Sequence, residues 1–209
     1  MPKALSAFGY NTVVQPIISS ANLITGLTLA GAVGTSGQVL TSAGSGLPTW
    51  STIAGFTFGT PVATTSGTAV TVTGIPTGTK MIIISLSKVS TDGTSRKLLR
   101  IGTSAGVAIT GYLSASFSNI AGALSNDNRT DGFIMRSIVA AHELSGQIFL
   151  TLENSSLNRW AISGSLFVQD GNVIMAGIMT LSGELDRVQF TTDAGTDTYD
   201  LGEIRIAYM

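Results

Sequence analysis

Apolar and polar residues alternate along most of the chain, and almost no stretch has helical spacing. Residues 69–73, AVTVT, alternate as a half-buried strand does. Residues 81–86, MIIISL, form a nearly continuous apolar run of strand length, and residues 203–208 alternate again. This pattern predicts strands near residues 55–58, 68–73, 79–89, 96–102, 106–117, 132–136, 147–153, 159–169, 172–181, 186–192 and 201–208.

Turn-forming residues separate the predicted strands. Asp170-Gly171 stands between two apolar runs, and an Asp-Gly pair tolerates the positive φ angles of a tight hairpin turn. The polar stretch from Ser118 to Asp131 is predicted to be the longest loop. Many short strands at this spacing predict an all-β fold, an antiparallel and jelly-roll-like β-sandwich.

The composition changes near residue 54, and we place a boundary there. Residues 1–36 are predicted to be an extended N-terminal segment, and residues 37–54 a Gly/Ser-rich extended connector. Residues 55–209 then form the sandwich domain, which is long enough to enclose a core of its own.

Charge is scarce and unevenly placed. Charged residues make up 11% of the 209 residues, and residues 4–79 contain none at all. A flexible linker explains such a segment, and so does a segment packed against copies of itself or a larger assembly. Interspersed aliphatic residues favour packing, because plain linkers lack them. They are Val13, Val14, Ile17, Ile18, Leu23, Ile24, Leu27 and Leu29.

The remaining charge excludes several classes of partner and site. A net charge of −1 is a poor match for nucleic acid or an anionic membrane. Residues 13–33 are interrupted by polar residues, so no membrane insertion is expected. The absence of cysteine excludes disulfides, thiolate catalysis and cysteine zinc sites. A basic group at residues 80–100 and an acidic group at 184–203 form solvated faces or pair across subunits.

Three stretches in order resemble bacteriophage fibre and tail proteins. Residues 37–50, GQVLTSAGSGLPTW, resemble a segment that recurs in those proteins. GIP at 74–76, KMIII at 80–84 and VSTDGTS at 89–95 resemble the start of the β-rich terminal domain of tail fibres. LDRVQFTT at 185–192 and GTDTYDLGEI at 195–204 resemble its closing strands.

The resemblance implies a virion structural protein that is assembled in the host cytoplasm and forms a homotrimer. Residues 1–36 would be the virion-attachment segment, in contact with other tail, neck or head proteins. The sandwich would project outward and contact a host surface glycan or protein. The chain is short for a long tail fibre and has no repetitive shaft. An architectural cement, collar or head-fibre component without a receptor is the alternative, followed by a glycan depolymerase.

Candidate chemistry is sparse, and we expect no enzyme, no cofactor and no metal site. His142 beside Glu143 suggests a base or a metal ligand, or else a solvated loop histidine. Asp193, Asp197 and Asp200 do not have calcium-loop spacing and fit turn caps better.

Candidate contact residues follow from the predicted loop and the uncharged segment. Side chains that can hydrogen-bond sugar hydroxyls offer a receptor contact, with Tyr112 as a stacking face or a core residue. These are Asn119, Asn126, Asn128, Arg129 and Asp131. Trimer or attachment contacts are predicted at Ile17, Ile18, Leu23, Ile24 and Trp50. Trp50 either closes the base of the sandwich between chains or packs within its own chain.

Overall fold

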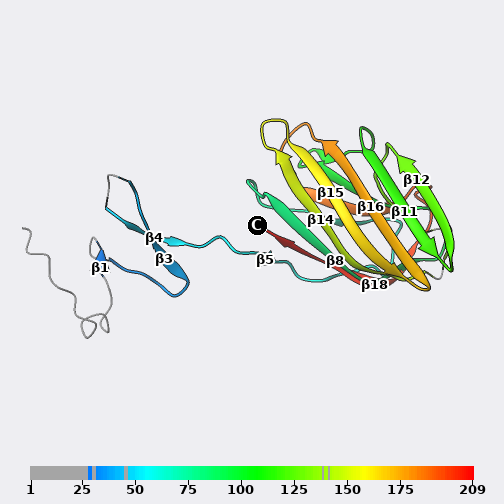
Figure 1. Ribbon diagram of the computed structural model, residues 1–209, viewed down its shortest axis with the longest axis horizontal. Coiled ribbons are helices and arrows are strands. Elements are labelled where there is room, and N and C mark those ends of the chain that lie inside the picture. The colour runs from blue at the N-terminus through cyan, green and yellow to red at the C-terminus, as the bar shows by residue number, and fades with distance from the viewer. Residues whose placement is uncertain (1–27, 30–31, 45–46, 138, 141) are drawn as a thin grey trace, which may run out of the picture. The chain divides into compact units, whose positions relative to one another are not determined.

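The computed structural model describes residues 28–29, 32–44, 47–137, 139–140 and 142–209. Within these residues the regular secondary structure consists of β-strands alone, and every strand pair is antiparallel (Figure 1). The chain divides into two units, Met1–Ala54 and Gly55–Met209. The predicted all-β, antiparallel fold class is confirmed for the described residues.

The first unit contains two short hairpins. β1 (Thr28–Leu29) pairs with β2 (Ala32–Val33), and β3 (Gln38–Thr41) pairs with β4 (Thr49–Thr52). An isolated two-stranded hairpin is at best marginally stable in water, because it buries little apolar surface. This unit therefore has little within its described residues that could hold it together alone.

Trp50 packs inside the first unit. A β-carbon added at Gly34 would lie 2.6 Å from the Trp50 ring, so the indole covers that glycine. This is an intrachain contact, and a role for Trp50 between chains stays a prediction. The other predicted attachment residues lie outside the described residues: Ile17, Ile18, Leu23 and Ile24.

The second unit is built from a large and a small antiparallel sheet. In spatial order, the large sheet contains β12 (Ala123–Arg129), β11 (Leu113–Ile120), β16 (Gly171–Thr180), β15 (Arg159–Val168), β14 (Leu144–Asn154), β8 (Met81–Thr91), β18 (Tyr199–Tyr208) and β5 (Thr57–Phe58), with β6 (Val62–Ala63) also on β18. The small sheet contains β10 (Gly106–Val107), β9 (Lys97–Thr103), β17 (Arg187–Thr192) and β7 (Val70–Val72), with β13 (Phe133–Met135) also on β9.

One hydrophobic core joins the two sheets. Ile84 and Ile148 of the large sheet and Val188 and Phe190 of the small sheet are fully buried members of it. The chain passes repeatedly from one sheet to the other, so neighbouring strands come from distant parts of the sequence. This packing of two sheets on a shared core gives the unit its sandwich-like form (Figure 1).

The turn between β15 and β16 lies one residue earlier than the sequence predicted. Val168 pairs with Gly171, so the turn residues are Gln169 and Asp170, and Asp170 has a φ of 65°. Gly171 already belongs to β16, where a β-carbon would collide with the carbonyl oxygen of Asn119. Glycine is required here for the close approach of β11 rather than for a positive φ.

Candidate functional site

The stretch predicted as the longest loop is a β-hairpin, and that prediction is wrong. β11 and β12 pair from Ser114 opposite Arg129 to Ile120 opposite Ala123. Ala121 and Gly122 form the tip, and both have positive φ angles. The polarity of β12 suggested a loop, but an edge strand is where a sheet accepts polar residues.

The polarity of β11 is reversed relative to an ordinary sandwich strand. Ser114 and Ser116 face the interior and are buried, whereas Leu113 and Phe117 face outward and are 63% and 43% exposed. An alternating strand normally turns its apolar side chains to the core, because burying them removes apolar surface from water. In β11 the core side is polar and the outer side is apolar.

Hydrogen bonds explain why serines face the interior. The backbone N–H of Ile134 donates to Ser114 Oγ at 2.9 Å, and that of Arg136 donates to Ser116 Oγ at 3.1 Å. Ser116 Oγ also donates to the carbonyl of Ile174 at 3.1 Å. The serines therefore serve backbone groups that β13 and the residue after it would otherwise bury without partners.

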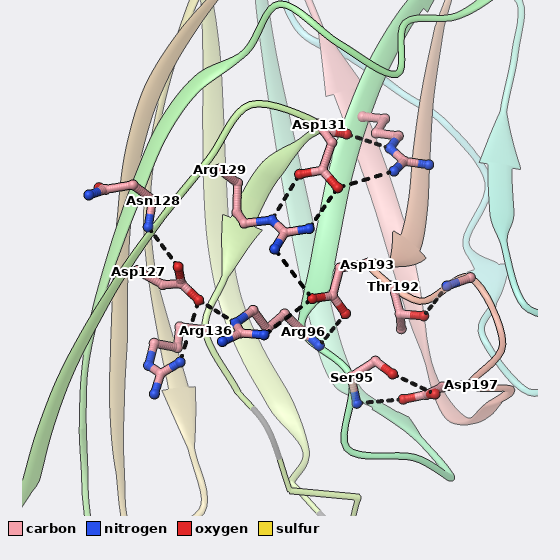
Figure 2. Close-up of polar contacts among 12 residues, drawn as sticks. Ser95, Arg96, Asp127, Asn128, Arg129, Asp131, Arg136, Thr192, Asp193 and Asp197 are labelled. Carbon is pink, nitrogen blue, oxygen red and sulfur yellow. Dashed lines mark hydrogen bonds and ion pairs between the residues drawn. The ribbon is translucent and has the colours of Figure 1, made fainter.

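A network of alternating charges lies beside these serines and joins the hairpin to the small sheet (Figure 2). Arg129, at the end of β12, binds Asp131 through Nε and Nη2 at 2.9 and 2.8 Å. Its Nη1 lies 3.6 Å from Asp193 Oδ2, just beyond β17. Arg96, just before β9, reaches the same Asp193 oxygen at 3.3 Å and also pairs with Asp127 of β12.

Two further arginines complete the network. Arg136 Nη1 lies 3.6 Å from Asp127 Oδ2, and its Nε donates to Ser125 Oγ at 2.8 Å. Arg100 of β9 donates from Nε to the Asp131 carbonyl at 2.7 Å, and its Nη2 lies 3.8 Å from Asp131 Oδ2. Each of these charged groups has an opposite charge beside it, so the network holds the edge hairpin against the small sheet.

Electrostatics within the network follow from these pairs. The hydrogen bond from Arg129 lowers the pKa of Asp131 below its ordinary value, and attraction to Arg129 and Arg100 acts in the same direction. The same hydrogen bond raises the pKa of Arg129. Both groups are held in their charged forms by each other, which suits a structural tie.

The predicted receptor-contact residues divide into two sets. Arg129 and Asp131 are occupied with each other inside the network, while Asn126 and Asn128 are exposed on the outward side of β12. Asn119 is exposed on β11 near the tip. In Figure 2 the side chain of Asn128 points away from the network, and its backbone N–H donates to Asp127.

Tyr112 is a core residue and offers no stacking face. It is fully buried, and its ring meets Phe133 edge to face at a centroid distance of 4.9 Å. Its hydroxyl donates to backbone carbonyls and accepts from the N–H of Ile101 at 2.8 Å. Burial raises the pKa of this hydroxyl to about 12.

The outward side of the large sheet is a second feature, which the sequence pattern alone did not reveal. We define the outward face as the outward positions of Leu113–Phe117, Asn172–Thr180, Ala161–Phe167, Ser145–Thr151 and Met81–Ser85, in β11, β16, β15, β14 and β8. None of these positions carries a charged side chain. Its large apolar members are Met81, Ile83, Leu113, Phe117, Phe149, Phe167, Ile174 and Ile178.

The apolar members of the outward face are neighbours across strands. Leu113 pairs with Ile178, and Phe117 pairs with Ile174. Alternation alone does not show which side of β11 faces the core, so the sequence pattern did not reveal this surface. The lack of charge at the outward positions of five adjacent strands is the sequence signal that could have shown it.

One ion pair within this chain joins the basic group at residues 80–100 to the acidic group at 184–203. Arg96 binds Asp193, and Asp197 accepts from the N–H and the hydroxyl of Ser95, both at 2.8 Å. The backbone N–H of Gly195 donates to Thr192 Oγ1 in the same turn. Among the described residues no group of three His, Asp or Glu side chains could hold a metal ion.

The single histidine makes a local contact with a buried serine. His142 Nδ1 lies 3.3 Å from Ser137 Oγ, and Ser137 is fully buried. Burial lowers the pKa of His142, and the nearby Lys97 adds to this shift. Lys97 is itself buried, and desolvation lowers its pKa against the attraction of nearby aspartates. Ser137 and Lys97 are buried, and His142 is half-buried with its Nδ1 beside Ser137, so they are poor candidates for contact with a substrate.

Comparison with other proteins adds no relative. The chain matches no protein-family model, no characterised protein and no solved structure. In the part of the chain described by the structure, no helix is long and apolar enough to cross a membrane.

Proposed function

We propose that this chain is a structural subunit of a bacteriophage virion, a homotrimeric fibre or tail-associated protein. The observation that carries the proposal is the first unit, whose described part has hairpins but no enclosed core. Val39 and Leu40 of β3 and Leu47 and Ile53 nearby are exposed, and no charged residue accompanies them. Such a segment gains stability by packing on other chains, as a docking segment does.

The sandwich domain suits the outer part of such a subunit. Its chain crosses repeatedly between two sheets, which supports a jelly-roll-like arrangement. Its charged groups are tied to one another, which supports a binding or structural role without catalysis, cofactor or metal. The ordered resemblance of residues 37–50, 74–95 and 185–204 to phage fibre proteins supports the same assignment.

Contact with the host surface is the task that we assign to the domain. The exposed Asn119, Asn126 and Asn128 present amide groups on the edge hairpin, where glycan hydroxyls or a protein could bind. An architectural collar or cement role is the second candidate. It is favoured by the pairing of Arg129 with Asp131, which leaves these side chains occupied.

The location of the subunit tests the proposal. Antibodies raised against the sandwich domain should label purified particles of the phage that encodes the chain. A chain lacking residues 1–54 should fold but should not join particles, because the docking segment is gone. Particles that carry no label, or that incorporate the truncated chain normally, would contradict the proposal.

Host adsorption separates the two roles. Particles carrying Asn126→Ala with Asn128→Ala should adsorb more slowly than wild-type particles if the hairpin contacts the host. Normal adsorption at equal subunit content would favour the architectural role.

A further inference from the structure

The outward face is apolar where water would be expected. Leu113, Phe167 and Ile174 expose 63%, 65% and 49% of their surfaces, and they lie on three adjacent strands. Monomeric soluble domains rarely expose contiguous apolar patches larger than a few hundred Å². On β11 the reversed polarity has two costs: serine hydroxyls are buried on the core side, and the apolar Leu113 and Phe117 face outward.

Charged residues mark the limits of this face on three sides. At one end of the strands Glu153 pairs with Arg159 at 2.7 Å, and at the other Lys88 pairs with Glu143 at 3.4 Å. Beyond β8, β18 carries the charged Glu203 and Arg205 at outward positions. On the β12 side the outward residues are Leu124, Asn126 and Asn128, which carry no charge, so charged residues bound the face at both strand ends and at β18 but not at β12.

The size and relief of the face suit a subunit contact. It offers about twenty outward residues, which is the number found on one side of a standard interface. Depletion of charge with aromatic enrichment is typical of an interface centre. A shallow hollow of about 470 Å³ lies over Ala115, Ala176 and Gly177, and its β12 side is lined by Asn128, Arg129 and Thr130.

We propose that the outward faces of three copies of this chain meet around a three-fold axis and pack against one another there. This inference rests on the proposed homotrimer and assigns its contact surface. An uncharged face of this extent packs best against another uncharged surface of similar size. The outward face of another copy of the chain is such a surface. Three copies related by a rotation axis would bury it without leaving an open edge.

A single engineered cysteine tests the contact without disturbing the fold. The chain has no cysteine, so Ala176→Cys places one thiol on the face, and Ala63→Cys places one on β6 as a matched control. In the full-length protein, Cys labelling by a maleimide should be at least about tenfold slower at position 176 than at position 63. Equal labelling of the two positions would overturn the proposal.

Charge insertion separates this inference from the homotrimer itself. Ala176→Lys should convert the full-length protein to a folded monomer, while Ala63→Lys, opposite Glu203, should leave the oligomer intact. A trimeric Ala176→Lys protein would overturn the surface assignment and leave the trimer standing. Slow labelling of position 176 in a monomeric wild-type protein would also overturn it, because another segment of the same chain would then cover the face.

Discussion

Two strands of the large sheet, β18 and β11, place their apolar side chains on opposite sides of the sheet. On β18, Ile204 and Ile206 face the core, while Glu203 and Arg205 face water, and Arg205 lies over the Phe58 ring at 5.3 Å. On β11, serines face the core and leucine and phenylalanine face outward. The strands belong to one sheet and share one core, so under the proposed assembly the difference lies in what their outer sides meet.

The comparison shows that alternation of apolar and polar residues identifies the apolar side of a strand. It does not show that this side faces the core of the same chain. β18 has the pattern of a strand with water outside. β11 has the pattern expected of a strand whose outer side is covered by another chain, with its inner side satisfied by hydrogen bonds. Backbone N–H groups of Ile134 and Arg136 supply the polar partners that the inner side of β11 requires.

Removing carbon atoms from the core side of β18 should have the largest effect. Ile204 is fully buried, so Ile204→Ala should lower the free energy of unfolding by about 2–5 kcal/mol through lost burial and a cavity. Phe117→Ala, on the outer side of β11, is the control. In the monomeric Ala176→Lys background its loss should be much smaller, measured by urea unfolding. Equal losses would break the comparison.

The close approach of β16 to β11 gives the next largest effect. Gly171→Val should lower the free energy of unfolding by about 1–3 kcal/mol, because its β-carbon collides with Asn119. Asp170→Gly, one residue earlier, should be neutral or stabilising, since it relieves a positive φ at a non-glycine residue. Thermal unfolding of both variants checks this, and an unchanged melting temperature for Gly171→Val would contradict the register.

The inward serines should contribute more than their small size suggests. Ser116→Ala should cost about 1–2 kcal/mol, because the Arg136 N–H loses its acceptor in a buried site. Ser163→Ala, on the outward face of β15, is the matched control and should have little effect on a monomer. If both substitutions are neutral in urea unfolding, hydrogen bonding does not explain the reversed polarity of β11.

The charge network should give the smallest effect and a distinct dependence on pH. Because the pKa of Asp131 is lowered in the folded protein, its stabilisation is present above the ordinary value of 3.8 and is lost as pH falls through the folded pKa. Asp131→Asn should therefore cost about 1 kcal/mol near neutral pH and nothing in strong acid. Urea unfolding of both proteins over a pH series measures this, and a constant difference would exclude the carboxylate as its source.

Sequence patterns were sufficient for the strands that keep one side in the core and the other in water. β17 and β18 lie close to their predicted ranges, since Val188, Phe190, Ile204 and Ile206 alternate with polar residues. The predicted strand at 106–117 is instead β10 and the start of β11, with the buried Tyr112 between them. A local sequence pattern cannot show this break, because the position of Tyr112 depends on its contacts with Phe133 and Ile101, which lie elsewhere in the chain.

The candidate site could be predicted only in part, because its contacts join distant residues. Arg129 and Asp131 were singled out from a polar stretch, but Arg100, which pairs with Asp131, comes from β9, and Asp193, which pairs with Arg129, follows β17. No local pattern reports that pairing. The intrachain contact of Trp50 is with Gly34, sixteen positions earlier in the chain.

The mass of the intact wild-type protein in solution tests the central claim most directly. Sedimentation of the full-length chain at micromolar concentration should give three times the chain mass of 21.5 kDa, because the outward face is buried between copies. A stable, soluble monomer at that concentration would show that the apolar outer side of β11 needs no second chain, and would contradict the account.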